Sequence, residues 1–231
     1  MHGFPHCHDL GGLPTRSGVT AHGAFFRSAA PRPGADWRSA RRAGIRTVVD
    51  LRNDDEIEPY DAPGMDLVHV PLDDVADVEF WRQVRREGRD GSPLYYPLFL
   101  ARKPERCAAA IAALVDARPG GVLFHCGLGR DRTGLVALLL LALADVEPAA
   151  IVADYLRVAR SAAPHQAPLI EAALRHHGTT LAEAVRATLD GLDPAGLLLA
   201  GGATSAQLTA IRTRSTHEGR PRRSGSVPRV W

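Results

Sequence analysis

A strand, a short loop containing glycine and an apolar helix follow one another along residues 121–144, and this segment constrains the fold more than any other part of the chain. The run Gly121-Val122-Leu123-Phe124-His125 is apolar on both sides, which is typical of a strand buried within a parallel sheet. The stretch from Thr133 to Ala144 is apolar nearly all round and predicts a buried helix. A buried strand that leads into a buried helix indicates an α/β layer fold.

Two other short apolar runs, Ile45 to Leu51 and Leu67 to Val70, also predict buried strands. Helices are predicted between and after the strands, and after Pro148 the pattern is almost wholly helical. The predicted helices cover Pro104 to Ala117, Ala149 to Arg160, Pro168 to His177, Leu181 to Leu189 and Ser205 to Arg212. We therefore expect an α/β fold with a central, mostly parallel sheet flanked by helices and a helical C-terminal third.

The charge is distributed unevenly along the 231 residues. Residues 212–231 hold six Arg and one Glu, and subtracting this +5 from the chain's +2 leaves −3 for residues 1–211. We predict one domain over residues 1–212 and a disordered, Arg-rich tail over 213–231, because the tail's composition buries little apolar surface. The mildly acidic body argues against nucleic-acid binding, whereas the tail is suited to contact an acidic membrane surface.

The sequence pattern predicts no membrane span and no secretory signal. The longest apolar run, Leu135 to Ala144, is about half of the roughly 20 residues needed to cross a bilayer, and the first residues lack a charged region followed by an apolar one. Cys7, Cys107 and Cys126 are widely spaced and odd in number, so they predict no disulfide framework. We expect a cytoplasmic protein, with export by a route without a signal peptide left open.

The loop between the predicted strand and helix contains Cys126, and Arg132 follows after five residues. A loop wrapped onto a helix N-terminus points several backbone N–H groups into one concavity, which favours an anion. Such dipoles and a nearby guanidinium also favour a thiolate, so we expect Cys126 to be largely ionised at neutral pH and to act as a nucleophile. The residues predicted to form the concavity and bind substrate are His125, Gly127, Leu128, Gly129 and Arg130.

Two further residues of this segment suit phosphoryl transfer. The planar guanidinium of Arg132 is suited to pair with two phosphate oxygens and to compensate the charge of the transition state. Thr133, in the first helical turn, is expected to stabilise the sulfur as a leaving group when a phosphocysteine is hydrolysed. Gly127 and Gly129 are expected to let the backbone approach the ligand closely.

The segment from His125 to Gly134 resembles the loop of the bacterial cysteine-dependent tyrosine phosphatases related to protein tyrosine phosphatase B, which has the pattern His-Cys-x-x-Gly-Lys-Asp-Arg-Thr-Gly. The resemblance extends from about Asp9 to Arg212. Its other motifs are Asp9-Leu10-Gly11-Gly12-Leu13-Pro14, Phe26-Arg27-Ser28-Ala29, Gly44 to Arg52 and Asp154-Tyr155-Leu156. The resemblance implies a tyrosine phosphatase-like fold and hydrolysis of phosphate monoesters through a phosphocysteine, without a metal or another cofactor.

Three positions differ from the family pattern. Arg130 replaces a loop Lys, Leu128 replaces a small residue, and His6-Cys7-His8 stands where an Asn-x-Arg element precedes Asp9. The first two bear on substrate preference, because Arg130 adds a second cation at the rim of the loop. Phosphotyrosine on a protein is the substrate that the resemblance implies, while phosphoinositide headgroups and phosphoserine or phosphothreonine stay open.

The leaving oxygen needs a proton, and three groups of Asp residues compete to supply it. Asp131 is the first choice because it lies inside the loop. Asp73 or Asp74 follows a predicted strand, roughly where other tyrosine phosphatases carry their acid. The third group, near the end of another predicted strand, is Asp50, Asp54 and Asp55.

Other interpretations compete with this one. A loop cysteine also handles anions in sulfur or arsenate transfer, and a catalytically silent phosphate-binding module is the alternative outside enzymes. The complete set of Cys126, Arg132 and Thr133 favours the phosphatase.

Other features of the chain allow a structural interpretation. The helices from Pro168 to Leu189 are either a lid over the pocket or ordinary packing. Cys107 is expected in the core, and Cys7 lacks the second His or Cys pair of a zinc site.

Overall fold

The computed structural model describes residues 1–58, 60–160, 162 and 164–216. Most of the tail predicted at 213–231 therefore lies outside the described residues. The start of that tail is corrected by the structure, because helix α10 (Ser205–Ser215) continues past Arg212 and buries Ser215. Residues 213–215 thus belong to the folded domain.

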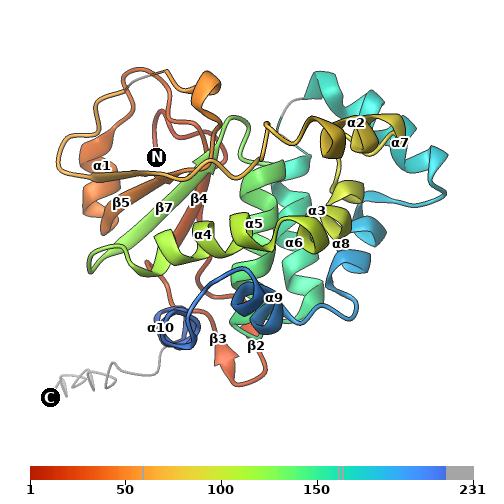
Figure 1. Ribbon diagram of the computed structural model, residues 1–231. Helices are drawn as coiled ribbons and strands as arrows, with labels where there is room; N and C mark the ends of the chain where they lie inside the picture. The colour runs from red at the N-terminus through yellow and green to blue at the C-terminus, as the bar shows by residue number, and fades with distance from the viewer. Residues whose placement is uncertain (59, 161, 163, 217–231) are drawn as a thin grey trace, which may run out of the picture.

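A five-stranded sheet with the order β1-β4-β7-β5-β6 forms one side of the molecule (Figure 1). Its strands are β1 (His8–Asp9), β4 (Phe25–Ala29), β5 (Ile45–Asp50), β6 (Asp66–His69) and β7 (Gly121–Cys126). Strands β4, β7, β5 and β6 are parallel, and β1 runs antiparallel to β4. The predicted mostly parallel sheet is confirmed. Strands β2 (Pro14–Thr15) and β3 (Gly18–Val19) form a separate hairpin.

The central strands contribute to two cores, because successive side chains of a strand point to opposite faces of the sheet. On β7, Val122 and Phe124 belong to the larger core, and Leu123 belongs to the smaller one. The smaller core includes Trp37 of α1 (Trp37–Arg42). Both faces of β7 are therefore covered, as its apolar run predicts.

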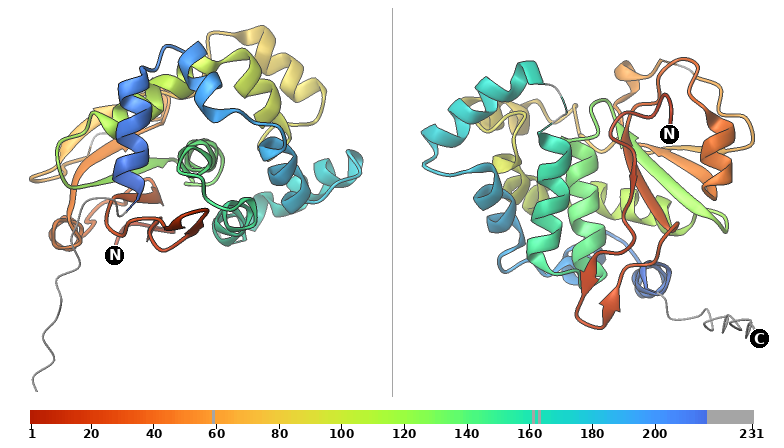
Figure 2. Two further views of the ribbon diagram at one scale, coloured as in Figure 1. Left: turned by 90° about the horizontal axis from the view of Figure 1, so that it is seen from below. Right: turned by 180° about the vertical axis from the view of Figure 1, so that it is seen from behind.

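Helix α5 (Asp131–Leu143) leaves β7 through the loop of residues 127–130 and is buried along almost its whole length. It contacts the sheet and a ring of helices, and the left view of Figure 2 shows α5 and α6 end-on beside each other. The helices in contact with it are α4 (Pro104–Val115), α6 (Pro148–Ala159), α9 (Pro194–Ala200) and α10. The predicted buried helix after the loop is confirmed.

The other helices are α2 (Val78–Arg86), α3 (Tyr96–Arg102), α7 (Ala167–His176) and α8 (Leu181–Leu189), with 3-10 turns η1 (Asp54–Glu56), η2 (Pro93–Tyr95) and η3 (Pro164–Gln166). The sequence pattern did not predict α1, α2, α3 or α9. The helical C-terminal third is confirmed, since α6 to α10 follow Glu147 without a strand among the described residues. Within the described ranges no helix has the length and hydropathy to cross a membrane.

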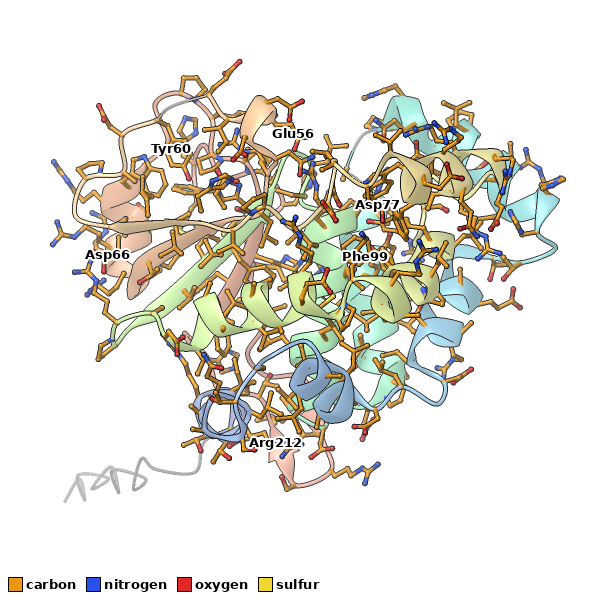
Figure 3. All side chains as sticks on the ribbon, viewed as in Figure 1. Glu56, Tyr60, Asp66, Asp77, Phe99 and Arg212 are labelled. Atoms are coloured by element: carbon orange, nitrogen blue, oxygen red, sulfur yellow. The ribbon has the colours of Figure 1, made fainter. Side chains whose placement is uncertain are left out.

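The parallel strands all end at one edge of the sheet. Ala29 at the end of β4 pairs with Cys126, and Asp50 at the end of β5 pairs with His125. Ligands in open α/β sheets bind outside the carboxyl ends of the strands. Figure 3 shows Glu56 and Tyr60 in the segments above this edge.

Candidate active site

Cys126 is the last residue of the middle strand of the sheet and is 2% exposed. Its neighbours in the chain are fixed on both sides: the His125 carbonyl accepts a hydrogen bond from the Leu51 amide at 2.8 Å, and the Gly127 carbonyl accepts one from the Ala30 amide at 3.0 Å. The sulfur-bearing residue therefore has a position set by β4 and β5 together.

The carbonyl groups of the loop are bound from outside it. Besides that of Gly127, the Gly129 carbonyl accepts a hydrogen bond from Arg27 Nη2 at 2.8 Å, and the Asp131 carbonyl accepts one from the Tyr96 hydroxyl at 2.7 Å. In a trans peptide group the N–H points opposite to the C=O. Where a carbonyl points out of the loop, the amide N–H of the following residue therefore points into it. These are the amides of Leu128, Arg130 and Arg132, and none of them donates to another described residue. The loop is thus built as an anion cradle.

Gly129 is required by the backbone of this loop. Its φ of +70° lies in the left-handed region, and a Cβ there would come within 2.5 Å of the Ser28 carbonyl oxygen. The close approach predicted for Gly129 is therefore to strand β4. Gly127 has neither feature, since a Cβ on it would meet no atom within 4 Å.

Arg132, in the first turn of α5, is held by two carboxylates. Its guanidinium pairs with Glu56 of η1 through both Nη atoms, the Nη2 to Oε1 distance being 2.8 Å, and its Nε lies 3.4 Å from Asp73 Oδ2. Burial opposes the charge of Arg132, but Glu56 and then Cys126 raise its pKa. Arg132 is thus close enough to Cys126 for the two groups to interact electrostatically.

Glu56 is a residue of the site that the sequence did not reveal. Hydrogen bonds from Arg132 lower the pKa of Glu56, which favours its carboxylate form. This carboxylate is bound to the Arg132 guanidinium, the group that a phosphate would need. It is preceded by Asn53 in a capping box, in which the Asn53 amide donates to Glu56 Oε2 at 2.8 Å. The usable signal was the short Asn-x-x-Glu pattern after the β5 strand.

Asp73 differs from the other candidate acids in its surroundings. Burial raises its pKa from the ordinary value to about 6, and its Oδ1 is buried without a hydrogen-bond partner among the described residues. Its Oδ2 lies 3.5 Å from Asn53 Nδ2. Asp73 is therefore a carboxyl group beside Arg132 that keeps a proton up to about pH 6, where an ordinary Asp is already ionised.

The other candidates are occupied or exposed. The carboxylate of Asp131 accepts from Arg130 Nε at 3.0 Å and Nη2 at 2.8 Å. Asp74 pairs with Lys103 and Arg106, and the Lys103 hydrogen bond lowers its pKa. Asp50 pairs with Arg52, which overcomes the effect of burial and lowers the pKa of Asp50. Asp54 and Asp55 are exposed.

Arg130 does not lie at the rim of the loop, where the sequence analysis placed it. Its residue is 3% exposed, and besides Asp131 its Nη2 donates to the Gly91 carbonyl at 3.1 Å and to Gln166 Oε1 at 3.0 Å. The exposed side chain of the loop is Leu128, at 37%. Arg130 thus connects the loop to η3 and to the segment before η2.

A buried charged network explains two motifs of the chain. Arg27 of β4 donates to Asp154 of α6 at 2.6 Å as well as to Gly129, and Asp154 also contacts His8 Nε2 at 2.7 Å. Burial raises the pKa of Asp154, but His8 and Arg27 outweigh it, so the pKa is well below its usual range. The network therefore ties α6 and the N-terminal segment to the loop of residues 127–130.

Thr133 and His125 also contact the site. The Thr133 hydroxyl is buried without a partner among the described residues, so it is available to donate a hydrogen bond to the Cys126 sulfur. His125 is fully buried, its Nε2 lies 3.0 Å from the Tyr60 hydroxyl, and burial lowers its pKa.

The two other cysteines lie outside the loop. Cys107 is in the core as expected, and burial raises its pKa to about 12. Cys7 is half-buried, and burial raises its pKa to about 11.

Comparison with known proteins identifies the family of the chain. A sequence model described as the tyrosine phosphatase family matches residues 1–214. The chain belongs to the tyrosine phosphatase family.

Two relatives in sequence agree with this assignment. The chain is 30% identical over 197 residues to the triple specificity protein phosphatase PtpB of Mycobacterium tuberculosis, covering 71% of each chain. It is 33% identical over 158 residues to a Cupriavidus necator protein provisionally named a tyrosine-protein phosphatase, and this match covers 64% of the chain but 58% of that relative. P. aeruginosa TpbA, solved in complex with pTyr, aligns over 77% of this chain and 85% of its own at 21% identity, with a TM-score of 0.38.

Proposed function

We propose that the protein hydrolyses phosphate monoesters through a phosphocysteine on Cys126, with phosphotyrosine on a protein as the substrate. The observation that carries the proposal is the position of Cys126 at the end of β7, where it leads into a loop whose carbonyls are bound outward and which ends at Arg132. Inward amides and one guanidinium favour both a thiolate and the three equatorial oxygens of a transferring phosphoryl group.

In the proposed first step, the Cys126 sulfur attacks phosphorus, the bond from phosphorus to the ester oxygen breaks, and Asp73 gives its proton to that oxygen. In the second step, water attacks phosphorus and the bond to sulfur breaks. The Asp73 carboxylate accepts a proton from the water, and the Thr133 hydroxyl donates to the departing sulfur. Arg132 exchanges Glu56 for two phosphate oxygens in both steps.

A direct test is to trap the covalent intermediate. The full chain is mixed with an aryl phosphate in the presence of a metal chelator and quenched rapidly in acid, and the peptide containing Cys126 is weighed by mass spectrometry. We expect one added phosphoryl group on that cysteine and full inhibition by vanadate. Turnover without such an adduct, or turnover that requires a metal, would contradict the proposal.

The substrate class is tested by the same assay on three substrates. The M. tuberculosis relative is named a triple specificity phosphatase, so peptides with phosphotyrosine and phosphoserine are compared with a phosphoinositide. We expect kcat/KM to be highest for phosphotyrosine. A preference for either of the other two would overturn that assignment and leave the phosphocysteine chemistry in place.

Asp73 is proposed as the acid in preference to Asp131. Asp73→Asn should lower kcat/KM about 10²-fold for a phosphate ester with a poor leaving group and less than about 3-fold for an activated aryl ester, which needs no proton. Wild-type kcat/KM for the poor leaving group should fall above about pH 6, because Asp73 loses its proton there, and the fall should be absent in Asp73→Asn.

Asp131→Asn is the matched control for this prediction, since it also removes one loop carboxylate near Arg132. We expect Asp131→Asn to lower kcat/KM for both esters by similar factors. The fall of kcat/KM above about pH 6 should remain in this variant. If Asp131→Asn instead shows the selective loss on the poor leaving group, the acid is Asp131.

A further inference from the structure

A cavity of about 490 Å³ lies between α6, α7 and the start of α8. This volume is in the range of small-molecule sites. Of the catalytic loop, the described lining residues include Arg130 but not Cys126, Leu128 or Arg132. The cavity is therefore separate from the cradle that would hold a phosphoryl group.

The walls of the cavity are mainly apolar. Helix α7 contributes Ala167, Ile170 and Leu174, whose spacing of three and four residues places them on one helix face. Opposite them lie Tyr155 and Ala159 of α6. Leu174 is the residue of α7 that is buried, so most of this helix face covers the cavity without packing into the core. Such walls are suited to an acyl chain or an aromatic ring.

Three arginines lie in the walls of the cavity. Arg130 lies in the wall and is 3% exposed, and its Nε and Nη2 atoms are bound as described above. Its Nη1 makes no hydrogen bond with a described residue and is not among the fully buried atoms, so it is open to an acceptor from outside the protein. Arg160 and Arg175 also line the cavity, against Glu171, which lies 3.8 Å from Arg175. The described walls thus carry an excess of positive charge.

We propose that this cavity binds an amphipathic carboxylate, a molecule with one carboxylate on an acyl chain or aryl ring. The apolar part lies against α7 and α6, and the carboxylate accepts a hydrogen bond from Arg130 Nη1. The proposal does not depend on the phosphatase activity, because the ligand, the walls and the readout are all separate from Cys126.

Calorimetry on the full chain, with decanoate below its micelle concentration, tests the proposal. Decanol supplies the same chain without the charge, and acetate supplies the charge without the chain. We expect decanoate to bind at least tenfold more tightly than either probe, and saturating vanadate should not displace it. Binding that vanadate abolishes would place the ligand in the phosphoryl cradle and overturn the proposal, as would the absence of binding or equal binding of decanol.

Two tryptophan substitutions on α7 give a matched pair. Ile170→Trp fills the cavity and should weaken decanoate binding at least tenfold, whereas Leu169→Trp, at a position 74% exposed, should leave it unchanged. Equal affinities of the two variants would show adsorption elsewhere on the surface and reject the site. Ala159→Leu narrows the cavity from the opposite wall and replaces Ile170→Trp if thermal melting shows that variant unfolded.

Discussion

Replacing Cys126 with Ser is expected to reduce kcat/KM at least about 10⁴-fold on activated and poor leaving groups alike. The serine hydroxyl is protonated at neutral pH and is a much weaker nucleophile than a thiolate. Because the inward amides and Arg132 remain, the variant should still bind an oxyanion such as tungstate within a few-fold of the wild type. Stopped assays with an aryl phosphate and calorimetry with tungstate measure the two effects.

Cys107→Ala is the control for the loss of a thiol as such. Cys107 is fully buried in α4 with a pKa raised to about 12 by burial, so it is neither accessible nor ionised. Its replacement should cost stability through a small cavity but leave kcat/KM within about twofold. The nucleophile assignment fails if Cys126→Ser keeps more than one hundredth of the wild-type rate.

Replacing Arg27 with Met should lower the free energy of unfolding by about 3–5 kcal/mol. The Arg27 and Asp154 side chains are each 1% exposed, and removal of the cation leaves a buried carboxylate with His8 and Arg157 as partners. The Gly129 carbonyl also loses its donor, so oxyanion binding should weaken in the folded variant. Urea unfolding and vanadate inhibition measure these two losses.

A double substitution separates stability from loop position. Arg27→Met combined with Asp154→Leu replaces the ion pair by apolar groups of similar size, which is often neutral for stability. We expect the double variant to regain most of the free energy of unfolding. Vanadate inhibition should stay weak, because the Gly129 carbonyl still lacks the hydrogen bond from Arg27. Recovery of both properties would show that Arg27 does not position the loop.

The fold was predictable where a segment is apolar on both sides or all round. The runs at β5 and β7 and the buried α5 carry that signal in a few consecutive residues. The predicted burial of β6 was wrong, because β6 is an edge strand and its Leu67 is 51% exposed. Strand β4 has five buried residues, yet its sequence Phe-Phe-Arg-Ser-Ala contains a charge that only a partner on α6 makes tolerable. Arg27 and Asp154 are 127 residues apart, and no local pattern reports such a pairing.

The candidate site was predictable for the loop and less so for the residues around it. The loop residues are consecutive, so one motif places Cys126 and Arg132 together. The roles of Asp73 and Asp131 depend on burial and ion pairing, which the sequence does not show: Asp73 is 15% exposed, while Asp131 is bound by its neighbour Arg130. The direction of Arg130 follows from contacts with Gly91 and Gln166, which lie far from it in the chain.

The attachment of the loop to β4 and α3 has a consequence for folding. These contacts join segments separated by 35 to 102 residues, so loop closure entropy must be overcome before the cradle exists. A chain that has formed only its local helices would hold the cysteine in an unstructured environment with ordinary reactivity. The rate at which a refolding sample becomes sensitive to vanadate should therefore match the slowest cooperative step of assembly, and partly folded molecules should be catalytically inert.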